Sequence, residues 1–196
     1  ERGRSGEVLA GNKPTSPVQF LENGMRFTAD VIHGQKTGFF LDQRDNRALV
    51  RRLSRGRRVL NLFSFNGGFS VAAGLGSAKH VTSVDIAEPA IEAANSHWVD
   101  NGLAVESHRG VAVDVFDFLE SSQQPKQTWD LVICDPPSFA PSESTKSTAL
   151  AAYARLAQLA AKATASGGLL ALASCSSHVD HGDFINCNAE ALGNAR

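Results

Sequence analysis

Residues 129–139, WDLVICDPPSF, decide the fold that this sequence predicts. The first half is an apolar run too short for a helix, which is typical of a buried strand. Proline lacks a backbone N–H and fixes its own φ, so the strand has to end at Pro136 and Pro137. The residue before a proline is restricted to extended conformations, which holds Asp135 at the carboxyl end of the strand. Ligands bind at that edge of an open α/β sheet, although Asp-Pro-Pro can also serve as a strand terminator alone.

Strand and helix patterns alternate along the rest of the chain. A hairpin is predicted first, because Asn23-Gly24 separates two short strand-like stretches at 18–21 and 25–31. Further strands are predicted at 58–63, 80–85, 105–109, 129–134 and 169–174, and helices at 42–53, 69–76, 89–101, 113–121, 148–165 and 183–192. Strands separated by helices predict an α/β fold, in which a mostly parallel sheet is covered by helices on both faces.

The composition indicates one globular domain in a reducing compartment. The chain has 196 residues, of which 42% are apolar, and this is enough for a core of its own. No stretch is long and apolar enough for a membrane span, and the first residues lack a signal peptide's apolar centre, so we expect a cytoplasmic protein without membrane contact. Neither the cysteines nor the histidines are grouped as metal ligands, and no disulfide or metal is expected. The cysteines are Cys134, Cys175 and Cys187.

The net charge of −1 hides a separation of charge along the chain. Up to Arg58 there are twelve Lys and Arg against six Asp and Glu, whereas the remainder has seven against fourteen. A cluster of arginines in the basic part could follow RNA phosphates or could be the solvated side of a helix, and the charge pattern leaves both interpretations open. The cluster consists of Arg44, Arg47, Arg51, Arg52, Arg55, Arg57 and Arg58.

Three predicted strands end in segments suited to a nucleoside. Gly67 and Gly68 allow a backbone to approach a ligand just before a helix begins. Asp85 can accept hydrogen bonds from both ribose hydroxyls, and Asp114 can accept one from an adenine amino group. Each feature could instead be a turn or a helix cap, but their joint occurrence favours a nucleoside site. The GxGxxG spacing is absent, which favours S-adenosylmethionine over a dinucleotide.

Five strings together carry a family resemblance. They are KTGFFLDQRDNR (36–47), VLNLFSFNGGFSVAAG (59–74), VTSVDIAEPAIEAA (81–94), WDLVICDPPSF (129–139) and GGLLALASCSS (167–177). Over residues 23–192 the chain resembles the class I S-adenosylmethionine-dependent methyltransferases of large-subunit ribosomal RNA, the RlmI-like 5-methylcytosine enzymes. The resemblance implies a Rossmann-like sheet with strand order 3-2-1-4-5-7-6, S-adenosylmethionine as cofactor, and 23S-type ribosomal RNA as partner.

The same resemblance implies a nucleophile. Carbon-5 of cytosine is a poor nucleophile, so a thiolate must first add to carbon-6, and the resemblance gives this role to Cys175. It also implies that Asp135 is catalytic, by bonding the cytosine edge and stabilising the adduct. Cys134 is one residue before Asp135 on a strand and should face the opposite way, into the core, while Cys187 should pack within a helix. Related enzymes that methylate guanine nitrogen-7 lack the cysteine, so the identity of the target base depends on Cys175.

Further site residues complete the prediction. Gln43 and Arg44 are implied to bind the methionine end of the cofactor, with Arg44 suited to a carboxylate. Phe139 either stacks on a flipped base or packs under its loop. The full set of predicted cofactor residues is Gln43, Arg44, Phe63, Ser64, Phe65, Asn66, Gly67, Gly68, Asp85, Ile86, Asp114, Asp135 and Pro136. The predicted substrate residues are Pro137, Phe139 and Arg47.

We expect two parts in the chain: an N-terminal segment with the hairpin over 1–41, and a methyltransferase domain over 42–196. Compared with the family, the segment before the hairpin is too short for the RNA-binding PUA domain, and we expect the last two strands of the sheet to be missing. Two classes of function are open. The chain is either an RNA methyltransferase, acting on cytosine carbon-5 or on guanine or another nitrogen, or a catalytically silent domain that binds S-adenosylmethionine or RNA.

Overall fold

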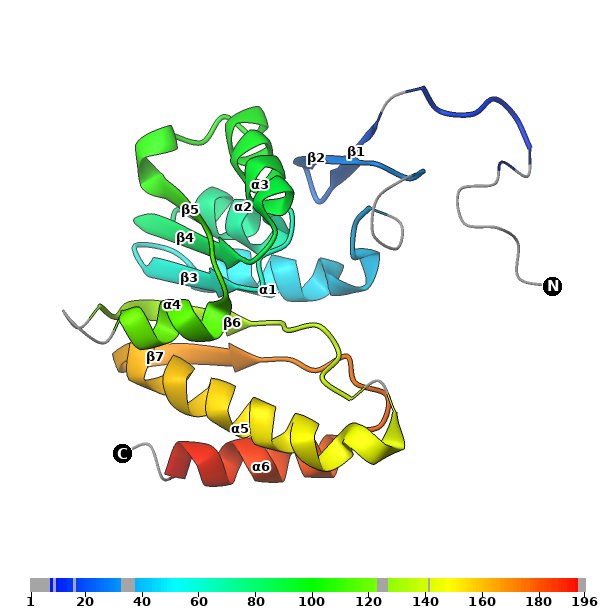
Figure 1. The fold of residues 1–196 in the computed structure, drawn as a ribbon. Coiled ribbons are helices and arrows are strands. Elements are labelled where there is room, and N and C mark those ends of the chain that lie inside the picture. The colour runs from blue at the N-terminus through cyan, green and yellow to red at the C-terminus, as the bar shows by residue number, and fades with distance from the viewer. Residues whose placement is uncertain are drawn as a thin grey trace.

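The computed structural model describes residues 8, 10–15, 17–32, 38–122, 127–140 and 142–193. Strands β1 (Val18–Glu22) and β2 (Met25–Ala29) pair antiparallel as a hairpin (Figure 1). Both turn residues have positive φ, 51° for Asn23 and 79° for Gly24, which is the conformation that this dipeptide favours. The predicted hairpin is confirmed, with β2 ending two residues earlier than expected.

The larger sheet has five parallel strands in the order β5-β4-β3-β6-β7. They are β3 (Arg58–Leu62), β4 (His80–Asp85), β5 (His108–Ala112), β6 (Trp129–Cys134) and β7 (Thr164–Leu172). The helices are α1 (Arg44–Leu53), α2 (Gly68–Leu75), α3 (Glu88–Asp100), α4 (Val115–Ser121), α5 (Lys146–Ala163) and α6 (His181–Gly193), with short 3-10 turns η1 (Leu41–Gln43), η2 (Val105–Ser107) and η3 (Glu143–Thr145). The predicted α/β fold is confirmed, and the order matches the first five strands of the family order. None of the helices described here is long and apolar enough to cross a membrane.

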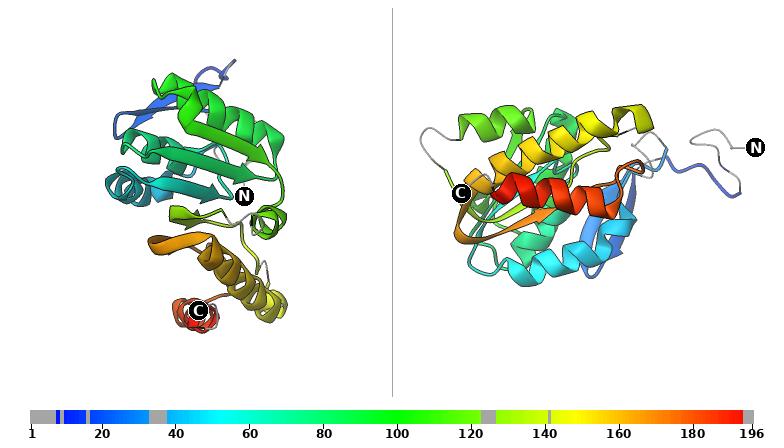
Figure 2. Two further views of the ribbon diagram at one scale, coloured as in Figure 1. Left: turned by 90° about the vertical axis from the view of Figure 1, so that its left-hand side faces the viewer. Right: turned by 90° about the horizontal axis from the view of Figure 1, so that it is seen from below.

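Alternate strand residues supply one apolar cluster on each face of the sheet. Leu60 and Val132 pack with α4 and α5, whereas Val59 and Val81 pack with the helices of the opposite face, α1 to α3. Helix α6 lies beside α5 (Figure 2). Because both faces are covered, the polar edge at the carboxyl ends of the strands is where a ligand can reach the sheet.

Two strands begin at positions that differ from the expectation. The predicted strand at 105–109 starts only at His108, because Trp98 Nε1 and Ser107 Oγ both donate to the Ala104 carbonyl, at 2.9 and 2.7 Å, and hold the turn η2. Strand β7 starts five residues earlier than expected. The register of its pairing with β6 shifts between Trp129 and Leu131. An irregular stretch of β7 therefore lies before the apolar run from which the strand was predicted.

The hairpin packs on α2 and α3. Its inner residues Met25 and Phe27 join Phe39 and Val71 in a buried cluster. The Arg26 N–H donates to Asn101 Oδ1 at 2.8 Å, and Asn101 Nδ2 donates a bond of 2.7 Å to the Arg26 carbonyl.

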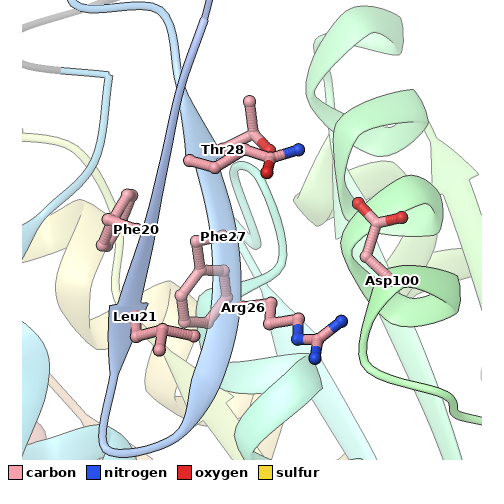
Figure 3. Close-up of a pocket in the computed structure, with 7 residues that line it drawn as sticks. Phe20, Leu21, Arg26, Phe27, Thr28 and Asp100 are labelled. Atoms are coloured by element: carbon pink, nitrogen blue, oxygen red, sulfur yellow. The ribbon is translucent and has the colours of Figure 1, made fainter.

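Two surface cavities of about 290 and 400 Å³ lie beside the hairpin. Figure 3 shows the first of them, with Arg26 directed from the hairpin toward α3; neither cavity is lined by the segments that follow β3, β4 or β6.

Candidate active site

The loop that follows β3 is hydrogen-bonded to the end of β4. The Ser64 N–H donates to the Val84 carbonyl at 3.0 Å, and the Phe65 N–H donates to Asp85 Oδ2 at 2.8 Å. The second carboxylate oxygen, Asp85 Oδ1, accepts the Ala87 N–H at 3.0 Å. Each carboxylate oxygen can accept more than one hydrogen bond, so these contacts orient Asp85 and still leave capacity for ribose hydroxyls.

The loop after β3 has an unusual backbone. Phe63 and Phe65 have positive φ angles of 56° and 47°, which is strained for aromatic residues and is typical of functional sites. Between them, Ser64 is buried and its Oγ has no hydrogen-bond partner among the residues that the structure describes. A buried hydroxyl without a partner calls for a ligand group or a water molecule. Beyond the adjacent strand end, Ile86 is 72% exposed and offers an apolar surface for a base.

Packing contacts require the two glycines of this loop. A Cβ on Gly67 would lie 2.7 Å from the Ala94 Cβ of α3, and Gly67 also has a positive φ of 80°. A Cβ on Gly68 would lie 3.2 Å from Arg47 Cδ. Contacts with Ala94 and Arg47 thus give a structural reason for both glycines, and their contact with a cofactor stays a prediction.

Asp114 is the N-cap of α4. Its Oδ1 accepts the backbone N–H groups of Phe116 and Asp117, at 2.8 and 3.2 Å. Of the two interpretations drawn from the sequence, the structure therefore supports the cap. A contact with adenine stays a prediction.

Arg47 corrects a prediction, because its side chain is only 3% exposed. Its guanidinium donates two bonds to the Glu22 carboxylate, at 2.7 and 2.6 Å, and a third of 2.8 Å to the Phe40 carbonyl. It also lies over the Phe39 ring, 4.5 Å from the centroid. Arg47 joins the hairpin to α1, and its assignment as a substrate-binding residue was wrong.

Other residues of the arginine cluster are also engaged. Arg57 donates to the Leu53 carbonyl, and Arg58 pairs with Asp130 at 3.6 Å. Positions 55–57 directly precede β3 and Arg58 is its first residue, so they lie at the amino edge of the parallel sheet, opposite the strand ends that hold Asp85 and Asp135. This part of the cluster is therefore remote from the candidate site.

The predicted residues for the methionine end lie at the start of α1. Gln43 Oε1 accepts a bond of 2.7 Å from Asn46, and Arg44 pairs with Asp45 on the surface. The preceding segment is tied to the loop after β3, because Asn66 Nδ2 donates to the Gly38 carbonyl at 3.1 Å. The structure thus places this segment beside the loop, while the cofactor role of Gln43 and Arg44 stays a prediction.

The three thiols have different surroundings. Cys175 is exposed just after β7, and its Sγ lies 3.7 Å from the Pro136 carbonyl oxygen. Cys134 is fully buried, and burial raises the pKa of its thiol well above the usual range. Burial also raises the pKa of Cys187, whose Sγ lies 3.4 Å from the Phe184 carbonyl oxygen in α6. Cys134 and Cys187 are packing residues, as predicted.

Phe139 lies in the loop that carries Asp135 and Pro137. Its ring is half-buried, 4.9 Å from the Tyr153 ring and 6.3 Å from the Phe63 ring. These contacts support packing over base stacking, whereas Pro137 is exposed. Tyr153, whose ring contacts Phe139 in this loop, was not predicted from the sequence. The polar SCSS run after β7 could have indicated buried hydroxyl contacts at this place.

The site residues fit a nucleoside cofactor. An oriented carboxylate, a buried hydroxyl without a partner and an exposed apolar side chain lie at the ends of neighbouring strands. Among the residues that the structure describes, no group of three His, Cys, Asp or Glu side chains could hold a metal ion.

The model of the S-adenosylmethionine-dependent methyltransferase family matches residues 2–189. The chain belongs to this family. S-adenosylmethionine is the family's cofactor, and the strand ends described above are suited to it.

Several relatives of this chain have names that state the kind of RNA on which they act. A ribosomal RNA large subunit methyltransferase of Deinococcus radiodurans is 46% identical over 179 residues, which cover 91% of this chain and 44% of that protein. Ribosomal RNA large subunit methyltransferase I of Photobacterium profundum is 40% identical over 184 residues, or 94% and 46% of the two chains. The crystal structure of SMU.776, a methyltransferase complexed with SAH, superposes with a TM-score of 0.85 at 32% identity and covers 94% of this chain and 48% of that one. The chain thus spans about half the length of the curated relatives that it matches.

Proposed function

We propose that this protein is an S-adenosylmethionine-dependent methyltransferase of large-subunit ribosomal RNA that modifies carbon-5 of a cytosine. Relatives named as ribosomal RNA large subunit methyltransferases support the substrate class. The observation that carries the choice of base is the exposed thiol of Cys175, which lies 3.7 Å from the carbonyl oxygen of Pro136, beside Asp135.

The reaction assigns a task to each of these groups. The Cys175 thiolate adds to carbon-6 of the base, which places electron density on carbon-5, and Asp135 bonds the cytosine edge and stabilises the adduct. S-adenosylmethionine, when bound, supplies the methyl group that carbon-5 accepts. A base then removes the carbon-5 proton, and the bond between sulfur and carbon-6 breaks to restore both the cytosine and the thiolate.

Asp85, Ile86 and the loop after β3 are the residues we propose for the cofactor. The Asp85 carboxylate would accept the ribose hydroxyls, Ile86 would cover the adenine, and the buried Ser64 hydroxyl would gain a partner. Gln43 and Arg44 would bind the methionine end, where a guanidinium suits a carboxylate.

A covalent trap tests the proposal. Ribosomal RNA that contains 5-fluorocytosine should form a stable adduct with the protein in the presence of S-adenosylmethionine, because fluorine is not removed as a proton is. Cys175→Ser should abolish the adduct and the 5-methylcytosine detected by mass spectrometry of the nucleosides, while Cys187→Ser serves as the control thiol. Methylation of guanine, or of any nitrogen, at an undiminished rate in Cys175→Ser would replace the proposal with the nitrogen-methylating alternative. Cofactor binding without methylation of any base would leave the catalytically silent domain.

A further inference from the structure

Three hydroxyl groups form a buried cluster behind the exposed thiol of Cys175. They belong to Tyr153 on α5 and to Ser174 and Ser176, the two neighbours of Cys175 in the chain. Tyr153 is 2% exposed and Ser176 is 6% exposed. The Tyr153 Oη lies 2.8 Å from both serine Oγ atoms. None of these groups has a part in the proposed chemistry.

Counting donors and acceptors gives each bond of this hydroxyl cluster a direction. Ser176 Oγ accepts the backbone N–H groups of Phe139 and Ala140, at 3.1 and 3.2 Å, which occupies both of its lone pairs. The Ser176 hydroxyl hydrogen is then left for Tyr153 Oη. The Tyr153 hydroxyl in turn donates to Ser174 Oγ, which also accepts the Ser176 N–H at 3.2 Å. A cluster whose members are all bonded holds its geometry firmly.

The hydroxyl cluster determines which way the thiol faces. The backbone beyond β7 continues the ladder with β6 through one more N–H···O=C bond of 2.9 Å. Ser174 and Ser176 both contact Tyr153, whereas Cys175 between them is exposed and its Sγ lies 3.7 Å from the Pro136 carbonyl oxygen, so the thiol lies on the Pro136 and solvent side of this segment.

The hydroxyl cluster also holds the loop that follows β6. Ser176 Oγ accepts the backbone N–H groups of this loop four and five residues beyond Asp135, and Ser138 Oγ lies 3.2 Å from the same oxygen. One side chain therefore links the segment that carries Cys175 to the segment that carries Asp135.

We propose that Tyr153 and Ser176 are positioning residues, which orient the Cys175 thiol and keep the Asp135 loop beside it. This inference rests on the proposed methylation of cytosine carbon-5. Both side chains are buried, so their loss should slow the formation of the covalent adduct and leave the binding of both reactants in place.

Tyr153→Phe and Ser176→Ala each remove one hydroxyl group without adding volume. With deproteinised large-subunit ribosomal RNA as substrate, kcat for 5-methylcytosine should fall about 10- to 100-fold in both variants, the scale expected for a displaced catalytic group. The KM for the RNA and the affinity for S-adenosylmethionine should change less than about 2-fold. The rate of adduct formation with 5-fluorocytosine RNA should fall by the same factor as kcat. Ser176→Thr keeps the hydroxyl and should restore most of the rate.

Ser54→Ala is the matched control. Ser54 is also buried, and its hydroxyl donates to the Val50 carbonyl at the end of α1, just before the amino edge of the sheet. This variant should keep the full kcat. Because Tyr153→Phe leaves both backbone bonds of Ser176 in place, it tests orientation even where Ser176→Ala disturbs the loop.

The outcomes separate this inference from the proposed function. Active wild-type protein together with unchanged kcat in Tyr153→Phe and Ser176→Ala would overturn the positioning role alone. A loss of kcat that merely follows the loss of folded protein or of cofactor binding would also overturn it. Wild-type protein that binds S-adenosylmethionine but forms no 5-methylcytosine would remove the proposed function and this inference with it.

Discussion

Two aspartates at neighbouring strand ends differ in the elements to which their carboxylates are hydrogen-bonded. Asp85 uses one oxygen for the loop after β3 and the other for the start of α3, so it connects two parts of the candidate site. Asp114 uses a single oxygen for two N–H groups of α4. The same residue type, one strand apart, therefore orients a site in one case and caps a helix in the other.

Asp85→Ala and Asp114→Ala should affect different quantities. Asp85→Ala is expected to weaken S-adenosylmethionine binding by roughly 1.5–3 kcal/mol, the scale for hydrogen bonds to a charged group. Asp114→Ala should instead lower the free energy of unfolding by about 0.5–2 kcal/mol, as the loss of an N-cap does. Calorimetric titration and urea denaturation measure the two effects. Unchanged cofactor affinity in Asp85→Ala would contradict the assignment of this strand end.

At the scale of elements, polar bonds fasten the hairpin to the sheet domain. The Thr28 N–H donates to His97 Nε2 at 3.0 Å, which places the ring hydrogen on Nδ1, where it bonds the Asn66 carbonyl at 2.8 Å. One buried histidine of α3 thus links β2 to the loop after β3. The buried pair of Arg47 and Glu22 makes a second link, between α1 and β1.

Removing one partner of the Arg47–Glu22 pair should be costly. Arg47→Met leaves the Glu22 carboxylate buried and unpaired, so the free energy of unfolding should fall by about 3–5 kcal/mol. The double variant Arg47→Met with Glu22→Leu removes both charges and should recover most of that loss. Arg44→Met, which breaks an exposed pair, should cost less than about 1 kcal/mol. Urea denaturation of the four proteins tests this, and a double variant as unstable as Arg47→Met would contradict it.

His108 connects stability to pH. Burial, followed by the charge of nearby His80, lowers the pKa of His108 to about 4, and the ring bonds Ser83 Oγ and stacks on Trp98. Because its pKa in the folded state lies below the unfolded value of about 6.5, the unfolded chain binds the proton first on acidification. The stability that His108 supplies is present above about pH 6.5 and is lost as the pH falls toward 4, by about 3 kcal/mol. His108→Gln should show a shallower decrease of unfolding free energy across this window than the wild type, and an equal decrease would contradict the assignment.

At the scale of the whole molecule, the two faces of the sheet share the same strands. Trp98 belongs to the cluster under α1 to α3, and Trp129 to the cluster under α4 and α5. Leu60 and Val59 are neighbours on β3 and face opposite clusters, so neither cluster can lose its packing without exposing the strand that supports the other. Such an arrangement favours a single cooperative transition.

Single-tryptophan variants test this cooperativity. Trp98→Phe leaves the fluorescence of Trp129, and Trp129→Phe leaves that of Trp98, so each variant reports on one face. In each variant, the denaturation midpoint by fluorescence should coincide with the midpoint by far-ultraviolet circular dichroism. Midpoints that separate between the two methods would show that the faces unfold independently.

Short-range rules determined much of the architecture. The prolines after Asp135 end β6 where the sequence predicts, because proline cannot continue a ladder. The Asn23-Gly24 turn is set by two residues that tolerate positive φ. The alternation of short apolar runs with helical patterns fixed the class of fold, since each element carries its own period. The position of Cys175 at a strand end also followed from local pattern.

Contacts between distant segments decided the rest. Arg47 looked like a surface charge of a helix, and only the docked hairpin brings Glu22 to it, 25 residues away in the chain. The starts of β5 and β7 depend on the strands with which they pair, and the glycines at 67 and 68 are required by α3 and Arg47. The bonds that join Tyr153 to Ser174 and Ser176 span more than 20 residues. A local pattern records propensity and period, whereas burial and hydrogen-bond partners are set by elements that meet only in the folded chain.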